Sequence, residues 1–119
     1  MDNLKALQAH VRSVLASRVQ YAQSWRVDEL TRLVVRYWPH IHLEEIERLG
    51  GPNHKDIDHT MTLVRAQVRE RWEAVHGVGP LWPMVLGGTV TNISHVILGL
   101  WWRDPSWRET LREMETVVD

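Results

Sequence analysis

Histidine and acidic side chains are the residues of this chain most able to bind a metal ion. The chain has 119 residues with seven histidines and no cysteine, which excludes thiolate ligands and disulfides. The candidate ligands nearest one another in sequence are His40, His42, His54, Asp58 and His59. A helical metal site needs ligands three or four residues apart, and only His54 and Asp58 meet that spacing. We therefore expect solvated or capping histidines and no bound metal.

Residues that serve elsewhere as nucleophiles, acids or bases form no catalytic pattern here. The chain lacks cysteine, a G-x-S-x-G nucleophile motif and a G-x-x-x-x-G-K phosphate loop. Glu44, Glu45 and Glu47 are typical of the solvated face of a short helix. His95 lies among apolar residues, as a core histidine bonded to a carbonyl does. We expect no enzyme activity, no cofactor and no small-molecule substrate.

The composition is typical of one soluble globular domain spanning 1–119. Hydrophobic residues make up 44% of the chain and charged residues 24%, and the length allows one hydrophobic core. The formal net charge of -1 argues against binding nucleic acid or anionic membrane through bulk charge. The first residues lack the apolar core of a signal peptide, and no apolar run approaches the roughly 20 residues that span a bilayer. We expect a cytoplasmic protein without a membrane partner.

Apolar residues recur at helical spacing throughout the first 76 residues. The pattern predicts four helices, over 2–22, 28–38, 43–49 and 53–76, with Asp2 and Asp28 as caps of the first two. The strongest stripe is in the fourth helix and consists of Ile57, Met61, Val64, Val68, Trp72 and Val75. Gly50 and Gly51 separate the third helix from the fourth.

The C-terminal third, 77–119, is a tryptophan-rich extension of this bundle. Glycines and prolines over 77–89 predict a loop with one apolar turn at Leu81–Leu86. Residues 92–102 favour a helix, although their β-branched content also suits a buried strand. A last helix is predicted after Asp104, with Pro105 in its first turn and a Ser106…Glu109 capping box. The fold class is therefore all-α, a small bundle of about six helices.

A short helix, a glycine turn and a long helix also form a helix-turn-helix. Residues 42–60 read His-Leu-Glu-Glu-Ile-Glu-Arg-Leu-Gly-Gly-Pro-Asn-His-Lys-Asp-Ile-Asp-His-Thr. This stretch resembles the signature Ser-Leu-x-Glu-Ile-Gly-x-x-Phe-Gly-Gly-Arg-Asp-His-Thr-Thr-Val-x-His-Ala of the C-terminal DNA-binding domain of the bacterial replication initiator DnaA. The coinciding residues are Leu43, Glu45, Ile46, Gly50, Gly51, His54 and His59. The resemblance covers about 27–75 and implies a bundle similar to that domain or to Trp repressor.

The resemblance implies sequence-specific binding of double-stranded DNA, in replication control or transcription regulation, in a bacterium, plasmid or phage. Its base-reading positions fall on Asn53, His54 and Lys55, which suit contacts with base edges at a helix N-terminus. Farther along the helix, three polar side chains lie off the apolar stripe, where we expect phosphate contacts. These are Thr62, Arg65 and Arg69.

The same stretch departs from the family at Pro52, Asp56 and Asp58, which remove or oppose positive charge. Over 54–71 the chain has four basic and three acidic residues, a net charge of +1. Because proteins bind duplexes chiefly through phosphate neutralisation, this footprint is small.

The tryptophans of the C-terminal third support an alternative function, a helical protein-protein interaction module. Trp101 and Trp102 point about 100° apart on a helix, so both cannot be fully buried in a domain of this size. Tryptophan is often an energetic anchor of interfaces, and we expect one among Trp101, Trp102 and Trp107. The partner would be another protein or a second copy of the chain; a homodimer would also present two recognition helices to paired half-sites.

Overall fold

The computed structural model of the chain describes residues 3–16, 24–50 and 53–115. Across these residues all regular structure is helical, and no strand is present, which confirms the all-α prediction. The elements are α1 (Asn3–Leu15), α2 (Ser24–Arg36), α3 (His40–Arg48), α4 (His54–His76), a single π-helical turn η1 (Trp82–Leu86), α5 (Gly87–Arg103) and α6 (Pro105–Glu115).

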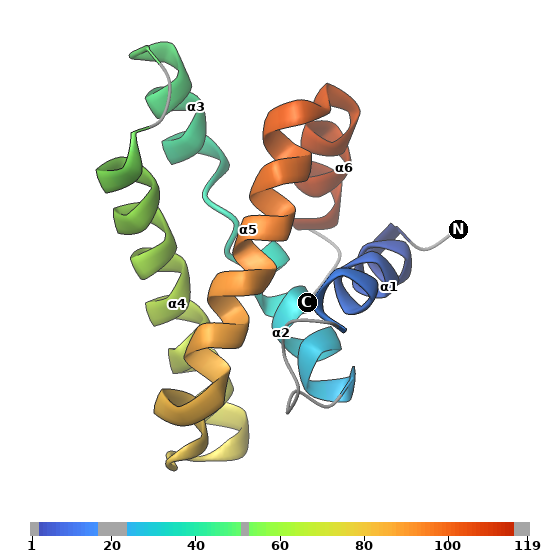
Figure 1. Cartoon of the computed structure of the whole chain (residues 1–119), viewed down its shortest axis with the longest axis vertical. Helices are drawn as coiled ribbons and strands as arrows, with labels where there is room; N and C mark the ends of the chain where they lie inside the picture. The colour runs from blue at the N-terminus through green and yellow to red at the C-terminus, as the bar shows by residue number, and fades with distance from the viewer. Residues whose placement is uncertain (1–2, 17–23, 51–52, 116–119) are drawn as a thin grey trace.

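Helix α5 lies at the centre of the bundle. It packs against α1, α2, α4 and α6, and it runs beside α4 in the opposite direction (Figure 1). Its buried apolar residues Val90, Ile93, Ile97 and Trp101 follow one another at steps of three or four. This period places them on one face of a helix, whereas a strand would need steps of two. Residues 92–102 are therefore helical, as the sequence favoured.

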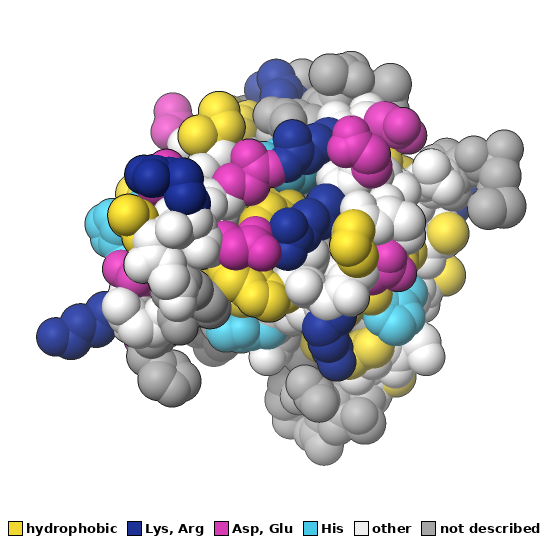
Figure 2. Space-filling model, turned by 90° about the horizontal axis from the view of Figure 1, so that it is seen from above, with side chains coloured by type: hydrophobic (Ala, Val, Ile, Leu, Met, Phe, Trp, Pro, Cys, Tyr) yellow, Lys and Arg dark blue, Asp and Glu magenta, His cyan; other side chains and the backbone are white. Residues whose placement is uncertain are grey.

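Positive and negative side chains lie next to one another at the end of the molecule that holds α3 and α6. Figure 2 looks onto this end and shows Lys and Arg beside Asp and Glu, with apolar atoms visible between them. Two ion pairs join the helices there, Arg108 with Glu47 at 3.0 Å and Arg112 with Glu44. Glu44 and Glu47 of α3 are therefore paired with arginines of α6, whereas Glu45 pairs with Arg48 of its own helix.

The predicted loop over 77–89 is wrong at its C-terminal end. Helix α5 begins at Gly87, five residues before the expected Asn92. The amide of Gly87 donates to the carbonyl of Trp82, so the hydrogen bonding of η1 continues into α5 without a break. Glycine is unfavourable in a helix because its backbone is flexible. Here the hydrogen bond to the preceding turn orders the backbone of Gly87, so the helix can begin at this residue.

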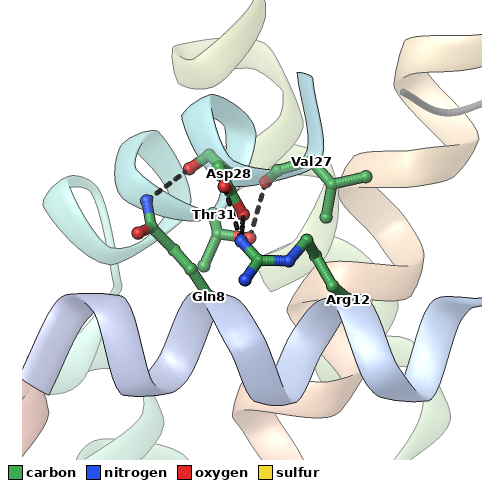
Figure 3. A network of polar contacts seen from close by, with 5 residues as sticks. All are labelled: Gln8, Arg12, Val27, Asp28 and Thr31. Carbon is green, nitrogen blue, oxygen red and sulfur yellow. Dashed lines mark hydrogen bonds and ion pairs between the residues drawn. The ribbon is translucent and has the colours of Figure 1, made fainter. Parts of the chain in front are cut away.

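Asp28 does not cap α2, because α2 begins at Ser24 and Asp28 lies in its second turn. Its carboxylate instead accepts two hydrogen bonds from Nη1 of Arg12 on α1, at 2.5 and 2.6 Å, and its carbonyl accepts one from Gln8 at 2.9 Å (Figure 3). The pair is partly exposed and contributes about 1 kcal/mol at most. Its role is to set how α1 lies on α2. The other predicted cap, Asp2, lies outside the described residues.

The N-terminal helices keep their predicted order with shifted ends. Helix α1 ends at Leu15, before the predicted 22, and 17–23 lie outside the described residues. Helix α3 begins at His40 and not at Leu43, because Pro39 takes the N-cap position and its carbonyl accepts the amide hydrogen of Leu43 at 3.0 Å. The extra turn brings α3 close to the end of α2.

Helix α4 extends over His54–His76, close to the predicted 53–76. Most of its apolar stripe is buried, although Val75, its last member, is exposed. Gly77 ends the helix at φ 85°, and its amide donates to the carbonyl of Glu73 at 2.8 Å. Only glycine adopts this left-handed conformation without strain. The prediction that the helix ends just before Gly77 is therefore confirmed.

Helix α6 begins at the cap that the sequence predicted. Oδ1 of Asp104 accepts the amide hydrogen of Ser106 at 3.0 Å and its hydroxyl hydrogen at 2.6 Å, and these bonds lower the pKa of Asp104. The expected Ser106…Glu109 capping box is wrong, because Ser106 lies inside the helix and its hydroxyl donates to Asp104. Leu111 and Met114 form the buried side of α6.

Candidate nucleic-acid interface

Helices α3 and α4 follow one another in the order that the helix-turn-helix prediction requires, and the structure describes Gly50 and Asn53 on either side of the turn between them. Gly50 follows α3 and has φ 118°. Residues with a side chain rarely adopt this left-handed conformation, whereas glycine does so readily. Asn53 then caps α4 in an extended conformation, and its Oδ1 accepts the amide hydrogen of Asp56 at 3.0 Å. Residues 51–52 between them lie outside the described part.

The packing of α3 depends on few apolar residues. Leu43 and Ile46 are buried and Ile57 of α4 is partly buried. Leu49 is 71% exposed and adds little to the packing, since the chain turns away at Gly50 directly after it. The ion pairs from α6 add a second support, so α3 is held from both sides.

The first turn of α4 is open to solvent. Asn53 and Lys55 are exposed, and α3 with this turn lies at the end of the molecule away from α1 (Figure 1). Among the described residues no carboxylate forms an ion pair with Lys55. The side chain of His54, the third predicted base-reading residue, lies outside the described part. The C-terminal tryptophans do not cover this turn.

Asn53 is only partly available to a ligand. Its side-chain oxygen is used by the cap, and the amide nitrogen is the group left to donate. Asp56 is half buried beside it, and its carbonyl accepts the hydroxyl hydrogen of Thr60 at 2.8 Å. The turn therefore offers donors, together with the amide end of a helix dipole, which favours an anionic partner.

The three predicted phosphate contacts lie elsewhere. Arg65 donates to the hydroxyl of Thr91 on α5 at 3.0 Å and to that of Thr62 at 2.9 Å, and Arg69 forms an ion pair with Glu73. Arg65 is also about 18 Å along the helix from Asn53. Thr62, Arg65 and Arg69 thus form a separate group beside α5. No local pattern pointed to Thr91, because its partner Arg65 is 26 residues away along the chain.

The tryptophans predicted as interface anchors divide into core and edge. Trp101 is fully buried and is not available to an interface, while Trp102 and Trp107 are partly buried and stay candidates. Trp102 is not fully buried, as expected for one of these two neighbours, and the two rings lie 5.2 Å apart at 51°. Arg108 lies over Trp101 at 4.3 Å. The guanidinium of Arg108 therefore covers the ring of Trp101 on that side.

An aromatic cluster at the far end of α4 was not foreseen. Trp25 stacks on Trp72 with 6.1 Å between ring centres, and His76 lies 4.3 Å from Trp72. Nε2 of His76 is 2.9 Å from a carboxylate oxygen of Glu29. Trp25, Trp72 and His76 line a cavity of about 230 Å³. Trp25 precedes the predicted start of its helix, so no helical pattern linked it to Trp72.

The candidate metal ligands do not assemble into a site. The rings of His42 and His59 come within 6.3 Å across α3 and α4, but in the part of the chain that is described no three His, Asp or Glu side chains group closely enough to hold a metal ion. His40 is buried and begins α3, and His95 is exposed and not a core histidine as expected. None of the described helices combines the length and apolar character needed to cross a membrane.

Comparison of the chain with protein-family models, with curated proteins and with solved structures finds no match. The resemblance to the DnaA domain therefore depends on the residues of 42–60. Within them, the chain has one residue fewer than the family signature between Ile46 and Gly50. From Gly50 to His59 the spacing is the same as in the signature. The agreement is thus strongest at the turn and at the start of α4.

Proposed function

We propose that this protein binds double-stranded DNA in a sequence-specific manner through α3, the glycine turn and the first turn of α4. The observation that carries the proposal is the exposed, capped N-terminus of α4, where Asn53 and Lys55 face solvent at one end of the molecule. A helix end of this kind fits the major groove, and Lys55 can donate to O6 and N7 of guanine.

The capping hydrogen bond of Asn53 limits which groups of DNA this side chain can contact. With Oδ1 bonded to the amide of Asp56, Asn53 donates from its nitrogen to a base acceptor or a phosphate, and the two-bond pairing with adenine requires the cap to open. Arg65 and Arg69 are engaged beside α5 and lie outside this interface. Because these two arginines take no part, few phosphates are neutralised, and we expect affinity to fall only weakly as the salt concentration rises.

Selection from random duplexes at about 0.15 M salt, followed by fluorescence anisotropy on the enriched motif, tests the proposal. Lys55→Ala should weaken binding by about 1 to 3 kcal/mol and relax selectivity at one base pair. Arg71→Ala is the matched control, because Arg71 is exposed on the opposite face of α4 and should change affinity little. The proposal fails if no motif is enriched, or if both variants bind alike.

Failure of the selection would favour the interaction module, whose partner is a protein or a second copy. The partly buried Trp102 and Trp107 are then the residues to change. Light scattering on Trp102→Ala and Trp107→Ala would show whether self-association is lost, as expected of interface anchors.

A further inference from the structure

A groove of about 470 Å³ lies between α4 and the start of α5, on a different part of α4 from the proposed DNA interface. Its polar side is formed by Thr62, Arg65, Arg69 and Thr91, and its apolar side by Trp82 and Pro83. Two of the lining residues are arginines, and no acidic side chain is among the described residues that line it. The charged side chains that line the groove are therefore basic, although Arg69 is paired with Glu73.

Arg65 is fixed in this groove without a carboxylate partner. Its two hydrogen bonds go to the hydroxyls of Thr62 and Thr91, at 2.9 and 3.0 Å. Each hydroxyl donates its own hydrogen to a carbonyl four residues earlier, at 2.8 Å to Asp58 and at 3.1 Å to Gly87. The hydroxyls thus present only lone pairs to the guanidinium, which holds its orientation.

The charge of Arg65 is consequently oriented and not neutralised. Within the described part of the chain, no carboxylate lies within ion-pair distance of Arg65, whereas Arg69 beside it is paired with Glu73. An arginine has five N–H groups, of which two are used here. The remaining donors suit an oxyanion, which guanidinium binds through two parallel hydrogen bonds.

We propose that this groove binds a small organic oxyanion, a carboxylate or a phosphate monoester, whose apolar part lies against Trp82 and Pro83. Arg65 makes the charged contact, and the two threonines hold it in place before the ligand arrives. Gly88 leaves the groove open at its rim, since a Cβ at this position would meet no atom within 4 Å. The proposal does not depend on DNA binding, because Asn53 and Lys55 take no part in it.

Titration of the labelled protein with benzoate and with phenyl phosphate, at constant ionic strength, tests the site by amide chemical shifts. Saturable shifts at Gly88 and Thr91, with a Kd of about 1 mM or lower, are expected for at least one probe. The tighter probe identifies the oxyanion. Arg65→Gln should abolish saturation, and Arg65→Lys, which keeps the charge but loses the planar fork, should weaken binding about tenfold.

Arg71→Gln is the control, since it removes the same charge from the opposite face of α4. It should bind the probes as the unaltered protein does. Circular dichroism checks that each variant folds, and if Arg65→Gln does not fold, the comparison of Arg65→Lys with the control decides. Shifts that rise linearly with both probes, or equal weakening in the Arg65 and Arg71 variants, would overturn the proposal.

Discussion

Arg108→Met removes one guanidinium that contacts two other helices. Nε of Arg108 donates to the carbonyl of Trp101 at 2.7 Å, its charge lies 4.3 Å from the centre of the Trp101 ring, and it pairs with Glu47 of α3 at 3.0 Å. Methionine keeps a long apolar stem and a good helix propensity. The substitution therefore tests the charge and its donors, and leaves α6 itself intact.

The expected loss follows from these three contacts. The Trp101 carbonyl is among the last four of α5, which have no partner inside their helix, and a hydrogen bond from a charged donor contributes about 1.5 to 3 kcal/mol. The cation–π contact adds about 0.5 to 1 kcal/mol, and the partly exposed ion pair about 0 to 1 kcal/mol. Because one group makes all three, they are not additive, and we expect about 2 to 3 kcal/mol in total.

Urea denaturation followed by circular dichroism measures this loss, and a thermal scan should show Tm lowered by about 8 to 12 °C. Glu47→Gln is the matched control, since it removes the ion pair and leaves both contacts with Trp101, and it should cost about 1 kcal/mol or less. Equal losses in the two variants would refute the reasoning, because the exposed ion pair would then account for the whole effect.

Four further substitutions test local features of the fold. Gly77→Ala forces a side chain into a left-handed conformation and should lower the free energy of unfolding by about 1 to 2 kcal/mol. Gly88→Ala, inside α5 with free space for a Cβ, should raise the free energy of unfolding by about 0.5 to 1 kcal/mol. Denaturant titration measures both changes. The Asp104 carboxylate has a lowered pKa because the hydroxyl and the amide of Ser106 donate to it, so its contribution to stability is present above the pKa of the unfolded chain and is lost as pH falls through the folded-state value. Ser106→Ala should raise this pKa in a carbon-13 titration. Leu7→Ala, at a fully buried position of α1, should cost about 2 to 5 kcal/mol, and a loss below about 1 kcal/mol would mean that α1 does not pack as described.

Local signals predicted the parts of the fold that local interactions stabilise. The stripe of α4 and the cap at Asp104 both involve residues within a few positions of one another, and the structure has both. Predictions failed where a neighbour in space competed with the local pattern. Asp28 is bonded to Arg12 of another helix and lies inside α2. Gly87 is a different case, because its amide donates to the carbonyl of Trp82, only five residues earlier.

The candidate interface shows the same division. Asn53 and Lys55 were expected at the exposed start of a helix, and their exposure follows from the turn and from the apolar stripe that faces the other way. The sequence could not show that Arg65 would face Thr91, or that Trp101 would be buried under Arg108, since these contacts depend on how α5 and α6 pack.

The sequence by itself determined the helical class, the order of the helices and the turn that presents α4. These follow from backbone propensity, capping and apolar period, which act over a few residues. Tertiary packing alone decided which charges stay available to a ligand. The guanidinium of an arginine reaches several ångströms from its own helix, so its partner depends on which helix packs beside it.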